Sequence, residues 1–157
     1  MKWYDAADKY DERAKYELDA VPEEWQRELV ALERALSNIM NGGYIQFLVN
    51  CGRPTYLYAS QAFKKIGATK TAKLLDRCQA LIEEHFPTEG KSTDELLVLM
   101  GSEVHLGGPI INEEGSILPD SVYGRIGDFD SEFMDHDWDD LAQAYFEARI
   151  KAGKKNK

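Results

Sequence analysis

An 18-residue segment without charge, residues 35–52, is the strongest constraint on what this chain can fold into. Its apolar side chains recur at the spacing of one helical face. They are Tyr44, Phe47, Leu48 and Cys51. Asn41-Gly42-Gly43 precedes this face, and glycine accepts the left-handed backbone that ends one helix before the next begins. The segment therefore predicts a central buried helix that starts after this break and stops near Gly52.

Two amide side chains form a second face of the same segment. Gln46 and Asn50 stand four residues apart, so they lie one above the other on a helix. A buried amide without a partner costs about 1–3 kcal/mol, and we expect both to bond to backbone or to neighbouring side chains. We interpret the whole motif as fold-determining, with a small-molecule pocket lined by the amides as the alternative. The motif consists of Asn41, Gly42, Gly43, Gln46, Phe47 and Asn50.

The rest of the chain also shows mainly helical periodicity. The expected helices run over residues 4–19, from Pro22 to about Asn41, from Arg53 to Gly67, from Thr69 to about His85, from Ser92 to about Met100 and from Asp137 to Ile150. Glycine and proline turn signals interrupt the period near residues 101–127, where either one long loop or a short hairpin fits. The sequence thus predicts an all-α fold: one compact multi-helix domain over residues 1–150 and a disordered Lys-rich tail over residues 151–157.

Charge and composition narrow the possible partners. The net charge is −9, and four of the positive charges are lysines in the last seven residues, which leaves −13 on residues 1–150. This balance argues against direct binding to nucleic acid or to an anionic membrane, and it suits either a basic protein partner or simple solubility. We find no signal peptide and no apolar run long enough to span a bilayer. Cys51 and Cys78 form no disulfide framework, so we expect a cytoplasmic protein.

The most acidic stretch, residues 128–140, contains no lysine or arginine. Interleaved aromatic residues are expected to anchor it to the core. Carboxylates four residues apart on one helix are about 5–6 Å apart, which is sparser than the one negative charge about every 1.7 Å of duplex DNA. Acids on several helices together can approach the charge density of the phosphates. We therefore predict this stretch as a partner-binding patch. Its members are Asp128, Asp130, Glu132, Asp135, Asp137, Asp139 and Asp140.

The sequence gives little support for catalysis or metal binding. No motif joins its three histidines to a cysteine, and the calcium-loop pattern starting at Asp128 fails because Phe133 occupies the glycine position. We expect no enzymatic activity, no metal and no cofactor. Six basic residues do cluster between residues 53 and 77, and such clusters more often balance acidic neighbours than bind nucleic acid. They are Arg53, Lys64, Lys65, Lys70, Lys73 and Arg77.

A set of short motifs carries a family resemblance. The motifs are Asn41-Gly42-Gly43-Tyr44, Gln46-Phe47, Asn50 with Gly52, Ile66-Gly67-Ala68 and Leu74-Leu75, with a weaker echo at Ile126-Gly127-Asp128-Phe129-Asp130. Over roughly residues 28–85 the chain resembles a bacterial domain-of-unknown-function family that includes a DNA-mimic protein. The resemblance implies an all-helical cytoplasmic domain that tends to form a homodimer, but mimicry depends on surface acids and carries over to no motif residue.

Three functions follow as expectations. The first is a non-enzymatic acidic interaction module whose partner is a basic protein, with a DNA mimic that blocks a DNA-binding regulator as its sharper form. The second is an immunity or antitoxin-like protein that neutralises a basic toxin by electrostatic complementarity. The third is a small-molecule binding or enzymatic domain built on the amides of Gln46 and Asn50.

Overall fold

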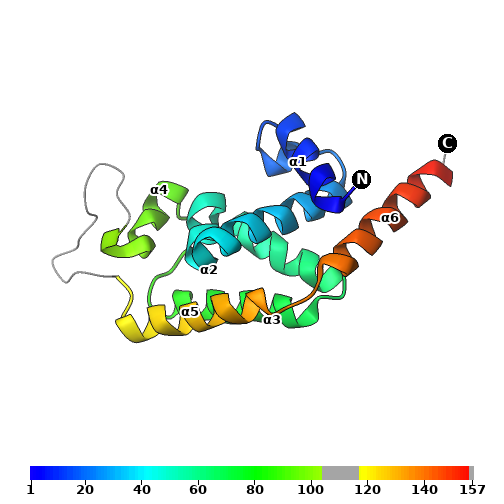
Figure 1. Cartoon of the computed structure of the whole chain (residues 1–157). Coiled ribbons are helices and arrows are strands. Elements are labelled where there is room, and N and C mark those ends of the chain that lie inside the picture. Colours follow the sequence, from blue (N-terminus) through cyan, green and yellow to red (C-terminus); the bar gives the residue numbers. More distant parts are fainter. Residues whose placement is uncertain (104–116, 156–157) are drawn as a thin grey trace.

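The computed structural model describes residues 1–103 and 117–155, and the described residues are helical without any strand. The elements are α1 (Trp3–Arg13), η1 (Leu18–Ala20), α2 (Glu24–Lys65), α3 (Thr69–Glu83), α4 (Thr93–Leu96), η2 (Leu97–Glu103), α5 (Asp120–Met134) and α6 (Asp139–Lys155), where η denotes a 3-10 helix. The all-α prediction is confirmed. Helix α2 runs through the middle, with α1 on one side and α3 and α5 on the other (Figure 1).

Helix α2 is three helical stretches joined at two glycines. Gly43 has φ 85° and ψ −175°, and Gly52 has φ 81° and ψ 160°. Only glycine adopts this backbone region without strain, so the two glycines set both turns. Pro54 directly follows the second turn, where its missing N–H costs nothing because the first turn of a helix has no internal partners. The breaks predicted at Asn41–Gly43 and near Gly52 are both confirmed.

The stretch between these glycines supplies the centre of the core. Tyr44, Phe47 and Leu48 are fully buried, while Cys51 is only half-buried. The Phe47 ring stacks on Tyr56 with centroids 5.2 Å apart, so the central stretch packs against the third stretch of α2. Fully burying such side chains stabilises a fold by about 1.5–3 kcal/mol each. The predicted central helix is therefore confirmed on its apolar face.

The amide face is different from its prediction. Asn41 and Asn50 are exposed and Gln46 is half-buried, so the expectation of two buried amides was wrong. Only one face of the uncharged segment is buried. Its amides lie at the surface, because a neutral polar side chain can face water just as a charged one can. Asn50 donates to the Oδ1 atom of Asn38 at 2.8 Å, which joins the first and central stretches across the Gly43 turn.

Two expected segment boundaries were also wrong. The region predicted as irregular up to residue 127 becomes helical at Asp120, where α5 begins, and residues 101–103 end η2. Gly124 and Gly127 both lie within α5, where packing of its apolar face outweighs their poor helix propensity. Residues 104–116 lie outside the described residues.

Helix α6 continues to Lys155, so the tail predicted to be disordered is helical over residues 151–155. Lysines near the C-terminal end of a helix stabilise it, because their positive charge interacts favourably with the helix dipole.

Helix α1 ends six residues earlier than predicted. Lys15 and Tyr16 have φ 54° and 64°, which turns the chain back toward α2. Arg34 on α2 holds this turn: its guanidinium donates to both oxygens of Asp11, at 2.6 and 3.0 Å, and to the carbonyl of Tyr16 at 2.7 Å. A bidentate, partly buried pair of this kind fixes geometry as well as charge.

The Gly43 turn yields a first prediction. Replacing Gly43 by Ala forces a strained backbone and places a Cβ atom 2.2 Å from the Asp130 carboxylate. We expect the free energy of unfolding to fall by at least about 2 kcal/mol in urea denaturation. Gly124→Ala is the matched control, because nothing lies within 4 Å of its Cβ in the described structure. That change should be neutral or stabilising by about 0.5–1 kcal/mol. Equal effects at the two glycines would contradict the assignment.

A second prediction concerns Glu33, beside the Arg34 pair. Burial, and then repulsion from Asp8 and Asp11, raises the pKa of Glu33 to about 7. The unfolded chain releases this proton near its ordinary pKa, so native stability falls as pH rises from about 4.5 to 7. Glu33→Gln should therefore stabilise the protein at pH 7.5 by about 1 kcal/mol, because the side chain stays partly in water. Thermal melts should show a gain of about 2–4 °C at pH 7.5 and little at pH 5. A gain of equal size at both pH values would refute this.

Candidate partner-binding surface

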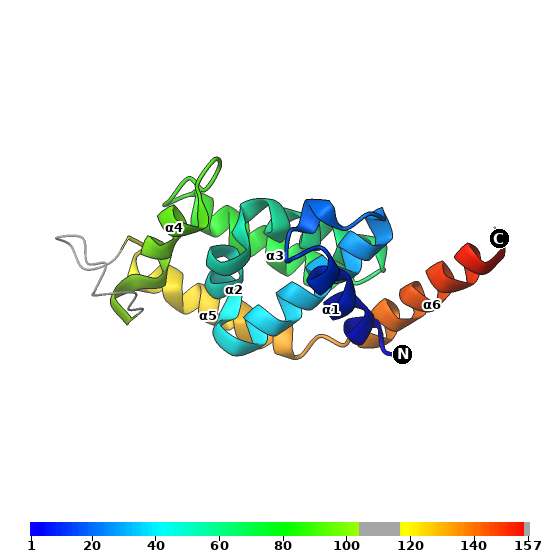
Figure 2. The same cartoon turned by 90° about the horizontal axis from the view of Figure 1, so that it is seen from above.

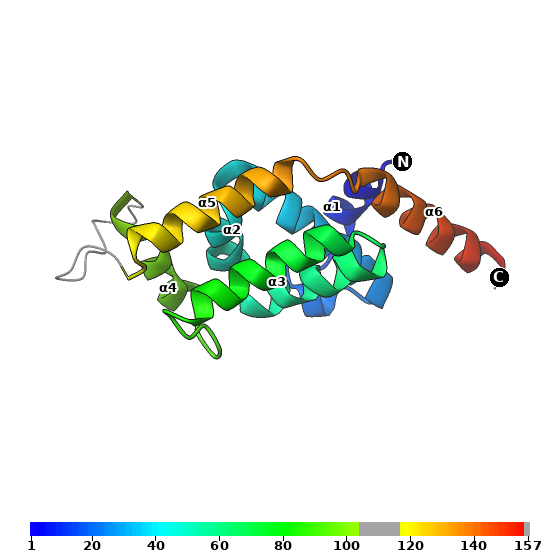
Figure 3. The same ribbon diagram turned by 90° about the horizontal axis from the view of Figure 1, so that it is seen from below.

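The predicted acidic patch lies on α5, on the linker of residues 135–138 and on the first turn of α6. Figure 3 shows α5 lying beside α3 and leading through this linker into α6, which projects from the end of the molecule. The same projection is visible from the other side in Figure 2. Apolar side chains attach the stretch to the core, as predicted: Phe129, Phe133 and Trp138 are buried. Met134 is the exception and is exposed.

Asp130 has a structural contact within this patch. Its Oδ1 atom accepts the backbone N–H of Tyr44 at 2.8 Å. That N–H belongs to the first turn after the Gly43 break, where a helix leaves its donors without internal partners. Asp130 thus caps the central stretch of α2 from a different helix. Burial raises its pKa to about 6, against a lowering by the Tyr44 hydrogen bond.

Asp139 is exposed but also accepts a hydrogen bond from within the protein. Its Oδ1 atom accepts the indole N–H of Trp3 at 2.6 Å, and the backbone N–H of Trp3 donates to Gln143 at 2.9 Å. Trp3 is fully buried and packs on Trp138 with ring centroids 5.7 Å apart. These contacts fasten the start of α1 to the start of α6. Two of the seven predicted patch residues therefore help to hold the fold together.

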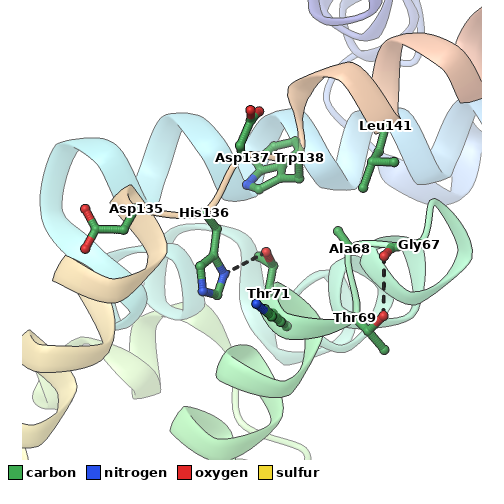
Figure 4. Close-up of a pocket in the computed structure, with 10 residues that line it drawn as sticks. Gly67, Ala68, Thr69, Thr71, Asp135, His136, Asp137, Trp138 and Leu141 are labelled. Atoms are coloured by element: carbon green, nitrogen blue, oxygen red, sulfur yellow. Dashed lines mark hydrogen bonds between the residues drawn. The ribbon is translucent and has the colours of Figure 1, made fainter.

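The linker between α5 and α6 is fixed on both sides. The Trp138 ring packs edge-on against the Phe63 ring, with the ring centroids 4.7 Å apart. On the other side, the Nδ1 atom of His136 lies 3.0 Å from the hydroxyl oxygen of Thr71 on α3. His136 and Trp138 thereby point toward the protein, while the carboxylates of Asp135 and Asp137 point away from it and from one another (Figure 4). The linker therefore presents its two acids at the surface in a defined arrangement.

Six of the seven acids are exposed, Asp139 among them, and five of these accept no hydrogen bond from within the described protein: Asp128, Glu132, Asp135, Asp137 and Asp140. Glu132 alone among them has a nearby basic group, the His136 ring at 3.9 Å. The structure thus divides the predicted patch into two acids that accept internal hydrogen bonds, Asp130 and Asp139, and five outward carboxylates. The Gly43 break signals that a restarting helix needs an acceptor, but no local sequence signal identifies Asp130 as that acceptor or Asp139 as the acceptor of the Trp3 indole.

A groove of about 360 Å³ lies under this linker (Figure 4). Residues 67–71, at the start of α3, form one side, and residues 135–138 with Leu141 form the other. Residues of both charges line the groove, with Lys70 on the α3 side and Asp135 and Asp137 on the other. His136 already contacts Thr71 within it. The arrangement brings the acids beside the first turn of α3 without grouping them around one point.

Three of the six basic residues of 53–77 meet acidic partners among the described residues. Lys64 lies 2.8 Å from Asp76, Arg53 lies 3.5 Å from Glu83, and Lys65 donates to the buried carboxylate of Glu28. Glu28 also accepts the hydroxyl of Tyr145, which attaches α6 to α2. Arg77 lies over the Phe129 ring at 4.9 Å. The interpretation of the cluster as balancing acidic neighbours is confirmed for Arg53, Lys64 and Lys65, while Arg77 packs on an aromatic ring instead.

The described part of the chain contains no group of three or more histidine, cysteine, aspartate or glutamate side chains placed to hold a metal ion. None of its helices is both long and apolar enough to cross a membrane. Burial raises the pKa of Cys51 to about 11 and that of Cys78 to about 12, so both thiols stay protonated at neutral pH.

Comparison with known proteins supports the family resemblance. A family model described as DMP19-like protein matches residues 19–152, which takes in α2 to α6 and all of the predicted patch. No match was found among curated proteins, and none among solved structures.

The Asp130 cap can be tested by substitution. Asp130→Ala removes the acceptor of the Tyr44 N–H and should lower the free energy of unfolding by about 1–2 kcal/mol at pH 7. Asp130→Asn keeps an oxygen at that position and loses the partly buried charge, so it should be clearly less destabilising. Asp128→Ala is the control on the same helix and should have little effect, because Asp128 is exposed. If the Ala and Asn variants at position 130 melt alike, the cap contributes nothing measurable.

Proposed function

The chain belongs to the DMP19-like family, and on that premise we propose that it is a non-enzymatic, acidic interaction module. Its partner would be a basic DNA-binding protein whose nucleic-acid surface it covers by mimicking DNA. The family includes a DNA-mimic protein, which makes this class of function the natural first proposal. The observation that carries it for this chain is the set of outward carboxylates on α5, the linker and α6.

Fixed geometry supports the proposal more than total charge does. Many acidic proteins are acidic only for solubility. Here the linker that bears Asp135 and Asp137 is held by the buried Trp138 ring and by the contact between His136 and Thr71. Side chains on a backbone that is already ordered lose less entropy when a partner binds. A protein surface built to bind phosphates would meet carboxylates whose positions are largely set before contact.

Asp130 and Asp139 fall outside the proposed contact set, because each already accepts an internal hydrogen bond. The outward set is Asp128, Glu132, Asp135, Asp137 and Asp140. A homodimer, as the resemblance implies, would double this set. The stoichiometry of a purified complex, read by light scattering, would report it.

The test is capture of a partner from the native lysate by the tagged protein. Replacing Asp128, Asp135, Asp137 and Asp140 by Asn should weaken capture at least tenfold at low salt, because opposite charges contribute to both encounter and affinity. The control changes four exposed acids elsewhere to their amides, with the same loss of charge and little effect expected. They are Glu12, Glu17, Asp19 and Glu89. Circular dichroism should show both variants folded.

The identity of the captured protein decides between functions. A DNA-binding protein that is displaced by duplex DNA and released by salt supports mimicry, since the duplex and this protein would compete for one surface. A toxin in the eluate would replace the proposal by the immunity function. Equal capture by the patch and control variants would remove the site assignment.

A further inference from the structure

A cavity of about 330 Å³ lies where α5 crosses the Gly43 turn of α2. Gly42, Ile45 and Gln46 form its wall from α2, η2 contributes Leu99 and Met100, and α5 contributes Tyr123, Ile126, Gly127 and Asp130. The walls are mainly apolar, and neither a lysine nor an arginine is among these residues. The cavity lies apart from the groove under the linker, with which it shares no residue.

The polar atoms at this cavity are mostly acceptors. Asp130 receives one hydrogen bond, from Tyr44 to Oδ1, and its Oδ2 atom has no donor among the described residues. The Tyr123 hydroxyl gives its proton to the Leu99 carbonyl at 2.8 Å, so only its lone pairs remain. Gln46 folds over Gly42, and a Cβ atom there would lie 1.8 Å from Oε1. The Gln46 side chain makes no hydrogen bond to the described residues.

An acceptor-rich, partly buried site without a cation is electrostatically incomplete. Burial raises the pKa of Asp130 to about 6, which means that water solvates this carboxylate poorly. At neutral pH the group is nonetheless mainly ionised. Charge-assisted hydrogen bonds to an ionised carboxylate are about twice as strong as neutral ones, so a donor cation is the ligand from which this site gains most.

We propose that this cavity binds an ammonium or guanidinium group carried on a short apolar stem. The cationic head would lie between Asp130 and Gln46, and the stem would lie along Ile45, Met100 and Ile126. Such a group occurs in free aliphatic amines and at the end of lysine or arginine side chains. None of the outward acids lines this cavity, so its test is independent of the test of the proposed DNA mimicry.

The test uses ligands that share one stem. Binding of n-pentylamine, 1-pentanol and pentanoate to the full chain is followed by two-dimensional NMR at pH 7.5, where Asp130 is ionised. We expect the amine to shift resonances of residues 42–46 and 123–130 and to bind at least tenfold more tightly than the alcohol. Pentanoate should bind more weakly still. Equal binding of amine and alcohol, or shifts confined to other regions, would overturn the proposal.

Two variants test the carboxylate itself. Asp130→Asn keeps the cap on Tyr44 but removes the charge, and it should weaken amine binding at least tenfold while leaving the alcohol unaffected. Asp120→Asn removes the same charge from an exposed site on α5 that does not line the cavity, and it should change amine binding by less than twofold. An equal loss of amine affinity in the two variants would show that only net charge matters, and it would overturn the proposed site.

A further ligand separates the two sources of the cation. Nα-acetyl-lysine methylamide carries the same ammonium on a peptide backbone. Tighter binding of this compound than of n-pentylamine would identify a protein side chain as the natural occupant, and the reverse would identify a free amine. Both results support the site, whereas failure of both compounds to bind overturns it.

Discussion

The hydrogen bond from the Tyr44 N–H to Asp130 is the contact on which the arrangement of the helices depends. A helix that restarts after Gly43 has donors without internal partners, and a buried donor left unpaired costs about 1–3 kcal/mol. Because the acceptor comes from α5, satisfying this donor also docks α5 on α2. Docking in turn brings Phe133 against the Tyr44 ring, with centroids 5.9 Å apart. The position of the acidic linker follows, since it leaves α5 one residue beyond Phe133.

The acidic sequence between residues 128 and 140 serves two physical purposes at once. The half-buried Asp130 and the exposed Asp139 accept hydrogen bonds from Tyr44 and Trp3, while the other five carboxylates leave this surface with negative charge. The apolar residues between these acids determine which carboxylates reach an internal donor, because burial of Phe129, Phe133 and Trp138 fixes the rotation of the chain. Local charge density alone therefore overstates how many of these acids are free to meet a partner.

Much of the fold could be predicted because its strongest signals are local. Two glycines with nothing but helical periodicity around them mark the turns of α2, and the apolar spacing from Tyr44 identifies the face that is buried. What could not be predicted depends on contacts between distant residues. The exposure of Asn50 and the cap supplied by Asp130 both follow from how helices meet, over separations of 12 and 86 residues. The start of α5 was missed because the turn signals before it were extended to Gly127, although its buried side chains Val122, Ile126 and Phe129 recur at helical spacing.

Imitating DNA with five outward carboxylates is a problem of geometry rather than of charge density. A duplex carries one charge about every 1.7 Å and condenses counterions, whose release drives much of its binding. Carboxylates on and between two helices are several times sparser, so they release fewer ions and gain less from that source. Affinity must then come from positions fixed in advance, which is what Trp138 and the contact between His136 and Thr71 provide. For this reason the internal contacts of the linker belong to the recognition surface as much as the exposed acids do.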